Sequence, residues 1–98
     1  VGGFHGDEPQ SVLLMDALLT RLVLPPDVLV IPCLNVDGLV AQTRVNANSV
    51  GLNRNYPTAN FEVQGQGTPY YGGQTPASEP ETLLMTSLIE QTRPLGIV

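Results

Sequence analysis

The alternation of apolar runs with one long periodic segment most constrains what residues 1–31 can fold into. Val1–Phe4 is a short apolar run, and Val28–Ile31 is a continuous run rich in β-branched residues, typical of a strand covered on both faces. Between them, apolar side chains recur at three- and four-residue spacings and predict a helix of about four turns: Val12, Leu13, Met15, Leu18, Leu19, Leu22 and Val23. Pro9 suits a first helical turn, and Pro25-Pro26 stops the helix. This order predicts a parallel strand–helix–strand unit.

A second helix and a further apolar run follow near the C-terminus. Ser78 and Glu81 have the spacing of a capping box, and Pro94 ends the helix. Its apolar stripe comprises Leu83, Leu84, Leu88 and Ile89, with Met85 beside it. Gly96–Val98 then begins what we interpret as another buried strand. We therefore predict an α/β fold: a mostly parallel or mixed sheet with helices on both faces and the active site at the strand ends. Both ends fall within predicted strands, so we expect residues 1–98 to be part of a larger domain.

The turn between the first predicted strand and helix carries His5 and Glu8. Imidazole nitrogen and carboxylate oxygen bind zinc at roughly 2 Å, so two such residues three apart can both reach one ion. A catalytic zinc needs three protein ligands and a water position, and His5 is the only histidine. A right-handed crossover would place Asn35–Gly38 near this turn. The alternative is a surface histidine beside an acid that caps the helix.

The stretch from Asn35 to Ala77 lacks apolar periodicity and is rich in Gly, Asn, Pro, Gln and Thr. Loop-rich stretches of this length are usually functional or disordered. We expect its aromatic residues to line a pocket: Tyr56, Phe61, Tyr70 and Tyr71. Arg44 and Arg54 have few acids nearby in sequence, and guanidinium groups suit recognition of carboxylates or of charge on a carbonyl oxygen. The alternative is that both are solvated or bind backbone carbonyls.

The composition of the chain argues against some classes of binding partner. Net charge is −5, and the four basic residues form no cluster and include no lysine, which argues against nucleic-acid or anionic-membrane binding. Apolar residues make up 42% of the chain and charged residues only 13%, which suits a largely buried domain. The single cysteine, Cys33, cannot form an internal disulfide and is interpreted as a small buried hydrophobe. No apolar run reaches the roughly 18 residues needed to span a bilayer.

Four motifs in order resemble the zinc carboxypeptidase family. They are His5-x-x-Glu8, Asn35-Val36-Asp37-Gly38, Arg44-Val45-Asn46 and Leu52-Asn53-Arg54-Asn55-Tyr56-Pro57. Within that family, Thr43–Ala47 and Ala77–Thr82 are most similar to the bacterial murein peptide amidase A branch. The resemblance covers essentially the whole chain, so residues 1–98 are interpreted as part of a zinc carboxypeptidase-like catalytic domain, truncated at both ends.

The resemblance implies one zinc ion per site and a role for each matching residue. His5 and Glu8 match the first two zinc ligands. Arg44 matches the residue that polarises the scissile carbonyl, while Asn53 and Arg54 match the pair that binds the substrate's terminal carboxylate. A third histidine ligand and a catalytic glutamate are expected beyond residue 98, so these residues alone are expected to be inactive.

The implied activity is hydrolysis of a peptide amide bond next to a free carboxylate. For this branch the partner is a small murein peptide containing γ-D-glutamyl-diaminopimelate, and the location is the cytoplasm. Neither a nucleic acid nor a membrane is expected as a partner.

One position departs from the family pattern. Gly51 stands where the family usually has an aspartate that accepts a hydrogen bond from the zinc-binding histidine, and loss of such a partner commonly costs 10–100-fold in metal affinity. We expect weakened zinc affinity, which aspartate at position 51 should restore. Two alternatives stay open: a deacylase like succinylglutamate desuccinylase or aspartoacylase, acting on N-acyl amino acids, and a non-catalytic carboxylate-binding module, which Gly51 favours.

Overall fold

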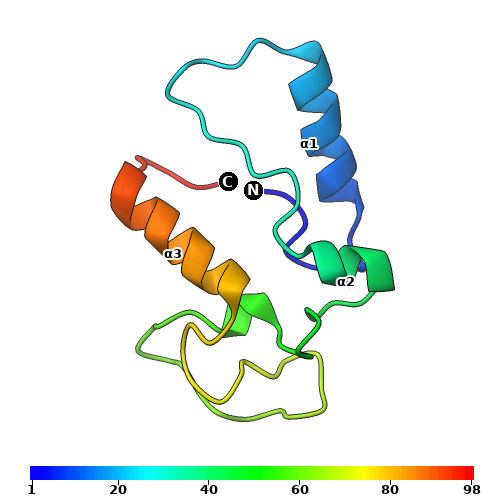
Figure 1. The fold of residues 1–98 in the computed structure, drawn as a ribbon, viewed down its shortest axis with the longest axis vertical. Helices are drawn as coiled ribbons and strands as arrows, with labels where there is room; N and C mark the ends of the chain where they lie inside the picture. Colours follow the sequence, from blue (N-terminus) through cyan, green and yellow to red (C-terminus); the bar gives the residue numbers. More distant parts are fainter.

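The computed structural model describes residues 1–98 and is built from helices joined by long loops (Figure 1). The elements are α1 (Gln10–Arg21), α2 (Val36–Ala41), the 3-10 helix η1 (Leu52–Arg54) and α3 (Pro80–Thr92). α1 and α3 lie apart, and both termini lie between them, where the Val1 amino group donates to the Val98 carbonyl at 2.6 Å. None of these helices has the length and apolar character needed to cross a bilayer.

The first predicted helix is confirmed, except that Leu22 and Val23, the last members of its predicted apolar series, lie beyond its end. α1 begins directly after Pro9 and ends at Arg21, where the Leu22 N–H still donates to the Leu18 carbonyl at 3.0 Å. No α1 residue is buried, and Leu13 is 68% exposed. The apolar face that predicted packing against a sheet is therefore without a covering layer.

The predicted sheet is wrong, because the structure contains no β-strand. Residues 1–3 and 31–35 run side by side, with Gly2 donating to Ile31 and Leu34 donating to Gly2 at 2.8 and 3.0 Å. Regular parallel pairing would have Cys33 donate to Gly2, so the register slips by one residue just after Pro32, which has no N–H. Gly3, at φ +63°, also leaves the extended conformation. Without two successive ladder bonds the α/β fold class does not form.

The other predicted strands also lack partners. No backbone hydrogen bond pairs residues 28–30 with a neighbouring segment, since the Val28 N–H donates to Pro25 within a turn. At the other end, residues 96–98 make one bond, from the Val1 amino group. β-branched composition predicts extended backbone, but a strand also needs a neighbour in register.

The second predicted helix is confirmed, but its capping box is not. α3 has Pro80 in its first turn and Glu79 as N-cap, and no side chain caps it. The Ser78 hydroxyl instead donates to the Glu79 carboxylate at 2.6 Å. Proline at the start of the helix moves the cap one residue beyond the position predicted from the Ser78–Glu81 spacing.

The short helix α2 was not predicted, because it lies within the stretch from Asn35 to Ala77, which lacks apolar periodicity and was expected to be loop-rich. The Asn35 side chain caps this helix by accepting the Gly38 N–H at 2.9 Å. Asn35 also joins the N-terminal segment, since its own N–H donates to Gly3 at 2.8 Å. The expected proximity of Asn35–Gly38 to the His5 turn is confirmed, because Gly6 packs on Gly38 too closely to admit a Cβ.

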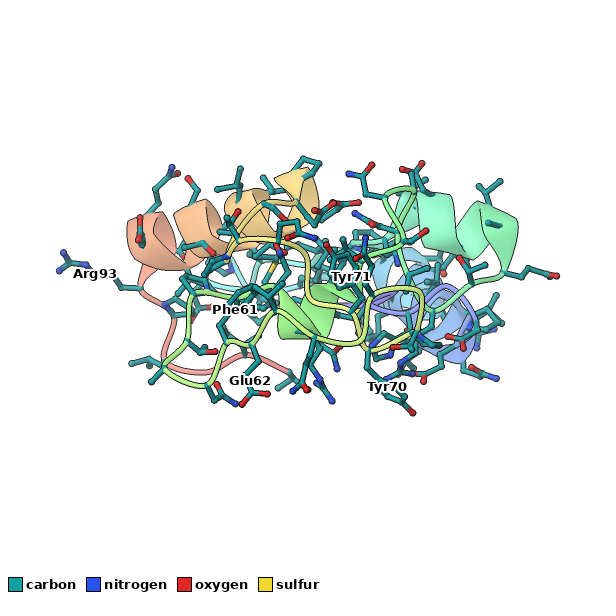
Figure 2. The ribbon with its side chains drawn as sticks, turned by 90° about the horizontal axis from the view of Figure 1, so that it is seen from below. Phe61, Glu62, Tyr70, Tyr71 and Arg93 are labelled. Atoms are coloured by element: carbon teal, nitrogen blue, oxygen red, sulfur yellow. The ribbon has the colours of Figure 1, made fainter.

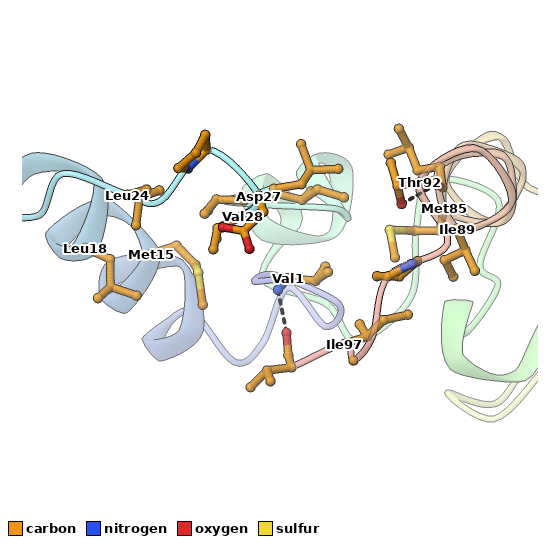
Figure 3. Close-up of a pocket in the computed structure, with 18 residues that line it drawn as sticks. Val1, Met15, Leu18, Leu24, Asp27, Val28, Met85, Ile89, Thr92 and Ile97 are labelled. Carbon is orange, nitrogen blue, oxygen red and sulfur yellow. Dashed lines mark hydrogen bonds between the residues drawn. The ribbon is translucent and has the colours of Figure 1, made fainter.

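The core is small and lies between η1, α3 and the N-terminal segment. Its buried apolar residues are Leu34, Leu52 and Met85, and Val1, Phe4, Ile31, Tyr56 and Ile89 pack around them. Beside it an apolar groove of about 760 Å³ runs between α1 and α3 (Figure 3). None of the predicted site residues lines this groove.

The loop between α2 and α3 contains only η1 as regular structure. Tyr71 is buried and Tyr70 is 62% exposed, and Figure 2 shows Tyr70 at the outer edge of this loop face. Tyr56 packs on Phe4, with ring centroids 6.3 Å apart. None of the loop aromatics lines the apolar groove or the small polar hollow beside Gly6 and Pro9. Cys33 was expected to be buried but is only half-buried, and this burial raises the pKa of its thiol.

Candidate active site

Three predicted site residues converge at the N-terminal end of α1. The His5 Nδ1 atom lies 3.3 Å from Glu8 Oε2, and the Arg44 guanidinium donates to Glu8 Oε1 at 3.0 Å. His5 and Glu8 come from one turn, whereas Arg44 follows α2. The Glu8 carboxylate is therefore shared between an imidazole and a guanidinium.

The neighbours of Glu8 in this cluster favour the charged form of its carboxyl group. The hydrogen bond with His5 lowers the pKa of the Glu8 carboxyl; desolvation opposes this, and Arg44 adds to the lowering. Glu8 remains 58% exposed at its side chain, while His5 is only 11% exposed. The carboxylate is thus ionised near neutral pH and open to a ligand from solvent.

The donor atoms fit part of a zinc site. His5 Nδ1 and a Glu8 oxygen face each other, and this pair of atom types is one that zinc binds. His5 Nε2 is buried and has no hydrogen-bond partner, so nothing in the protein holds that nitrogen. No group of three His, Cys, Asp or Glu side chains converges in residues 1–98, so His5 and Glu8 could supply only two of the three protein ligands that a catalytic zinc needs.

Asn53 and Arg54 lie on η1 and share no hydrogen bond or ion pair with that cluster. Both are exposed, and the Arg54 side chain bonds only the Asn53 carbonyl, at 3.5 Å. With no acid paired to it, this guanidinium is free to meet a carboxylate from solvent.

Gly51, which precedes η1, sits against two carbonyl groups. Its N–H donates to the Tyr71 carbonyl at 2.7 Å. A Cβ at this position would lie 2.8 Å from the Pro69 carbonyl oxygen. The space that a side chain at position 51 would need is therefore partly filled by backbone.

A polar network behind the loop was missed from the sequence. Glu79 is 4% exposed, and its carboxylate accepts hydrogen bonds from Asn46, Asn48 and Ser78 at 2.7, 2.8 and 2.6 Å. Burial raises the pKa of the Glu79 carboxyl, but these hydrogen bonds outweigh burial and bring the pKa below its ordinary value. The available signal was the asparagines of Arg44-Val45-Asn46 and Asn53-Arg54-Asn55, which were interpreted only as parts of the family motifs.

Comparison with known proteins explains why these residues occur together. The zinc carboxypeptidase family profile matches residues 1–98, the whole chain. The chain belongs to the zinc carboxypeptidase family. Zinc is the metal of this family, and the side chains that converge at α1 include donor types suited to it.

Relatives of this zinc carboxypeptidase chain include murein peptide amidase A of Escherichia coli strain K12, 34% identical over 112 aligned residues. Murein peptide amidase A of Vibrio campbellii is 36% identical over 114 residues. All of this chain is covered, against 46% and 44% of those two proteins, so the chain spans less than half the length of the curated relatives.

A solved structure supports the same relationship. The crystal structure of murein-tripeptide amidase MpaA from Escherichia coli O157 matches with a TM-score of 0.79 and 35% sequence identity. The match covers 95% of this chain and 44% of that one. The path of this zinc carboxypeptidase chain is therefore that of a known amidase over a shared part of its length.

Proposed function

We propose that this chain carries the metal-binding and carboxylate-recognition half of a zinc-dependent amidase, which hydrolyses the γ-D-glutamyl-diaminopimelate bond of murein peptides. The convergence of His5, Glu8 and Arg44 within 3.3 Å carries the proposal, because family matches alone assign no roles to residues. The names of the relatives support the substrate class. By the same branch resemblance, the location proposed is the cytoplasm.

In this proposal His5 Nδ1 and the Glu8 carboxylate hold the zinc ion. The chemistry that bound zinc supplies is Lewis acidity and activation of a water molecule for attack on the amide carbon. Arg44 would leave Glu8 when the metal binds and would donate to the oxygen of the scissile carbonyl, where negative charge develops. Asn53 and Arg54 would bind the substrate carboxylate and fix the amide bond in position.

Zinc titration of the chain, followed through the His5 imidazole NMR signals, tests the metal site. We expect the His5 signals to shift and the effect to disappear in Glu8→Gln, where the charged oxygen is lost. Asp7→Gln, a neighbouring acid on the same turn, is the matched control. Equal zinc responses in the Glu8 and Asp7 variants would refute the assignment.

Binding of γ-D-glutamyl-diaminopimelate tests the carboxylate site. Arg54→Gln should weaken binding about 10- to 100-fold, the loss of one charge-assisted contact. Arg93→Gln is the control, because Arg93 projects from the far end of α3 and makes no ion pair (Figure 2). Hydrolysis by residues 1–98 alone should be negligible, and turnover at a rate typical of a complete amidase would contradict this expectation.

Two other functions follow from the sequence. The matches to murein peptide amidases favour the amidase over the N-acyl amino acid deacylase. The non-catalytic carboxylate-binding module is favoured by Gly51, which stands where the family usually has an aspartate. Carboxylate binding that persists while no zinc response appears at His5 would favour this module.

A further inference from the structure

A buried carboxylate outside the predicted site lies between the segments that carry the arginines. Glu79 is 4% exposed and forms no salt bridge. A buried charge without a cation is costly unless hydrogen bonds compensate for it. Three side-chain donors do so here, and two of them belong to the loop from Asn46 to Asn55, named the 46–55 loop below.

Glu79 fixes the start of the 46–55 loop. Its Oε2 atom accepts from Asn46 Nδ2 at 2.7 Å and from Asn48 Nδ2 at 2.8 Å. Asn46 Oδ1 in turn accepts the N–H groups of Asn48 and Val50, both at 3.1 Å. Asn46 is 5% exposed, so its orientation is set by these partners, and Arg44 lies only two residues before it.

The same residue fixes the end of that loop. The Glu79 N–H donates to Asn55 Oδ1 at 3.2 Å, and Asn55 Nδ2 donates to Ser78 Oγ at 2.9 Å. Ser78 Oγ then donates to Glu79 Oε1 at 2.6 Å, which closes a ring of hydrogen bonds. Asn55 is fully buried and directly follows Arg54. Both ends of the loop are thus attached to one position at the start of α3.

We infer that Glu79 is a positioning residue for carboxylate recognition, an inference that rests on the function proposed above. It holds the 46–55 loop in the shape that presents Asn53 and Arg54 to the substrate. A carboxylate suits this place because it only accepts hydrogen bonds, and all three side chains around it are donors. Glutamine would turn its NH2 group either toward the two asparagine donors or toward Ser78, whose hydroxyl would then have to accept instead of donating.

The test compares binding of γ-D-glutamyl-diaminopimelate with binding of its amide at the diaminopimelate α-carboxyl. The ratio of the two dissociation constants measures selectivity for the carboxylate, and a loss of folded protein weakens both ligands equally. Glu79→Gln should lower this ratio about tenfold. This is the size of effect expected when one charge-assisted hydrogen bond between the protein and the ligand carboxylate is lost. Glu90→Gln, which removes an exposed charge from the same helix, should leave the ratio unchanged.

Two further variants keep the inference testable if Glu79→Gln does not fold. Asn46 Nδ2 also donates to the Glu81 carboxylate at 3.2 Å, so the rescue is made in a Glu81→Gln background. There the double variant Asn46→Asp with Glu79→Gln exchanges acceptor and donor, so it should restore the pair and recover selectivity. Asn48→Ala removes one exposed donor and should lower the ratio by a smaller factor.

The outcomes separate the two proposals. Wild-type selectivity that falls in Glu79→Gln and returns in the double variant supports the inference. Unchanged selectivity in a folded Glu79→Gln, or a folded double variant without selectivity, overturns the positioning role alone. A wild type that binds acid and amide equally refutes the carboxylate site itself, and the positioning role falls with it.

Discussion

Replacing Gly51 with aspartate sets two effects against each other. The family resemblance predicts that an aspartate at position 51 would accept a hydrogen bond from His5 and tighten zinc binding 10–100-fold. His5 Nε2 is buried without a partner, so an acceptor that reached this nitrogen would satisfy it. However, a Cβ at position 51 would lie 2.8 Å from the Pro69 carbonyl oxygen, closer than a side chain tolerates.

The free-energy cost of that crowding can be compared with the expected gain in zinc binding. Gly51 has φ −77°, an ordinary value, so no backbone strain adds to the contact. Overpacking typically costs 1–3 kcal/mol, which is large for a chain with three buried hydrophobic residues in its core cluster. The gain in zinc binding corresponds to about 1.4–2.7 kcal/mol, so the two effects are of similar size.

The comparison with Gly51→Ala separates the two effects, because alanine adds the Cβ without the carboxylate. Both variants should lower the urea midpoint by similar amounts. Zinc titration through the His5 signals should show tighter binding in Gly51→Asp than in Gly51→Ala, by at least about tenfold. Equal zinc affinities in two folded variants would refute the idea that position 51 supports His5.

Three other predictions follow from burial and charge. Leu52→Ala should cost about 2–5 kcal/mol of unfolding free energy in urea, because Leu52 is fully buried, whereas Leu13→Ala on exposed α1 should cost far less. The folded pKa of Glu79 lies below its ordinary value of 4.5, so the stability its carboxylate contributes is complete above about 4.5 and is lost as pH falls through the folded pKa. Acid titration of unfolding should therefore show a smaller loss of stability in Glu79→Gln, and an identical loss would contradict it. The exposed apolar side chains along the groove, among them Val28 and Ile97, should make the chain bind a hydrophobic dye and self-associate as concentration rises, which light scattering would detect.

The parts of the fold predicted correctly depend on local signals. α1 and α3 follow from apolar periodicity, with prolines near their ends, and both occur as predicted. The sheet depends on pairing between distant segments, and the register slip after Pro32 is not visible in the composition of either segment. α2 is six residues long and is fixed by one Asn35 side chain, too short a pattern to stand out from turn formers.

Part of the candidate site was predicted from the sequence and part was not. The sequence predicted that His5, Glu8, Arg44 and Arg54 lie at one edge. The structure brings the first three side chains together, whereas Arg54 shares no hydrogen bond or ion pair with them. Nothing in the sequence indicated that Glu79 would be buried, because acidic residues beside a helix start are usually solvated caps. The burial of Glu79 depends on asparagines more than 20 residues away, a contact that no local pattern encodes.

Buried asparagines therefore join distant segments of this chain, as the backbone hydrogen bonds of a sheet would in a larger α/β domain. Asn35 Nδ2 donates to the Phe4 carbonyl at 3.3 Å and to the Arg44 carbonyl at 3.5 Å, so one side chain joins the His5 turn to the Arg44 segment. Asn55 joins η1 to the loop before α3 through the Gly72 carbonyl at 2.7 Å. Each amide is 0% exposed, and leaving either group unpaired would cost more than the hydrogen bond itself contributes. The positions of Arg44 and Arg54 are thus set by side-chain to backbone hydrogen bonds, which explains how the site keeps its geometry although the structure has no strand.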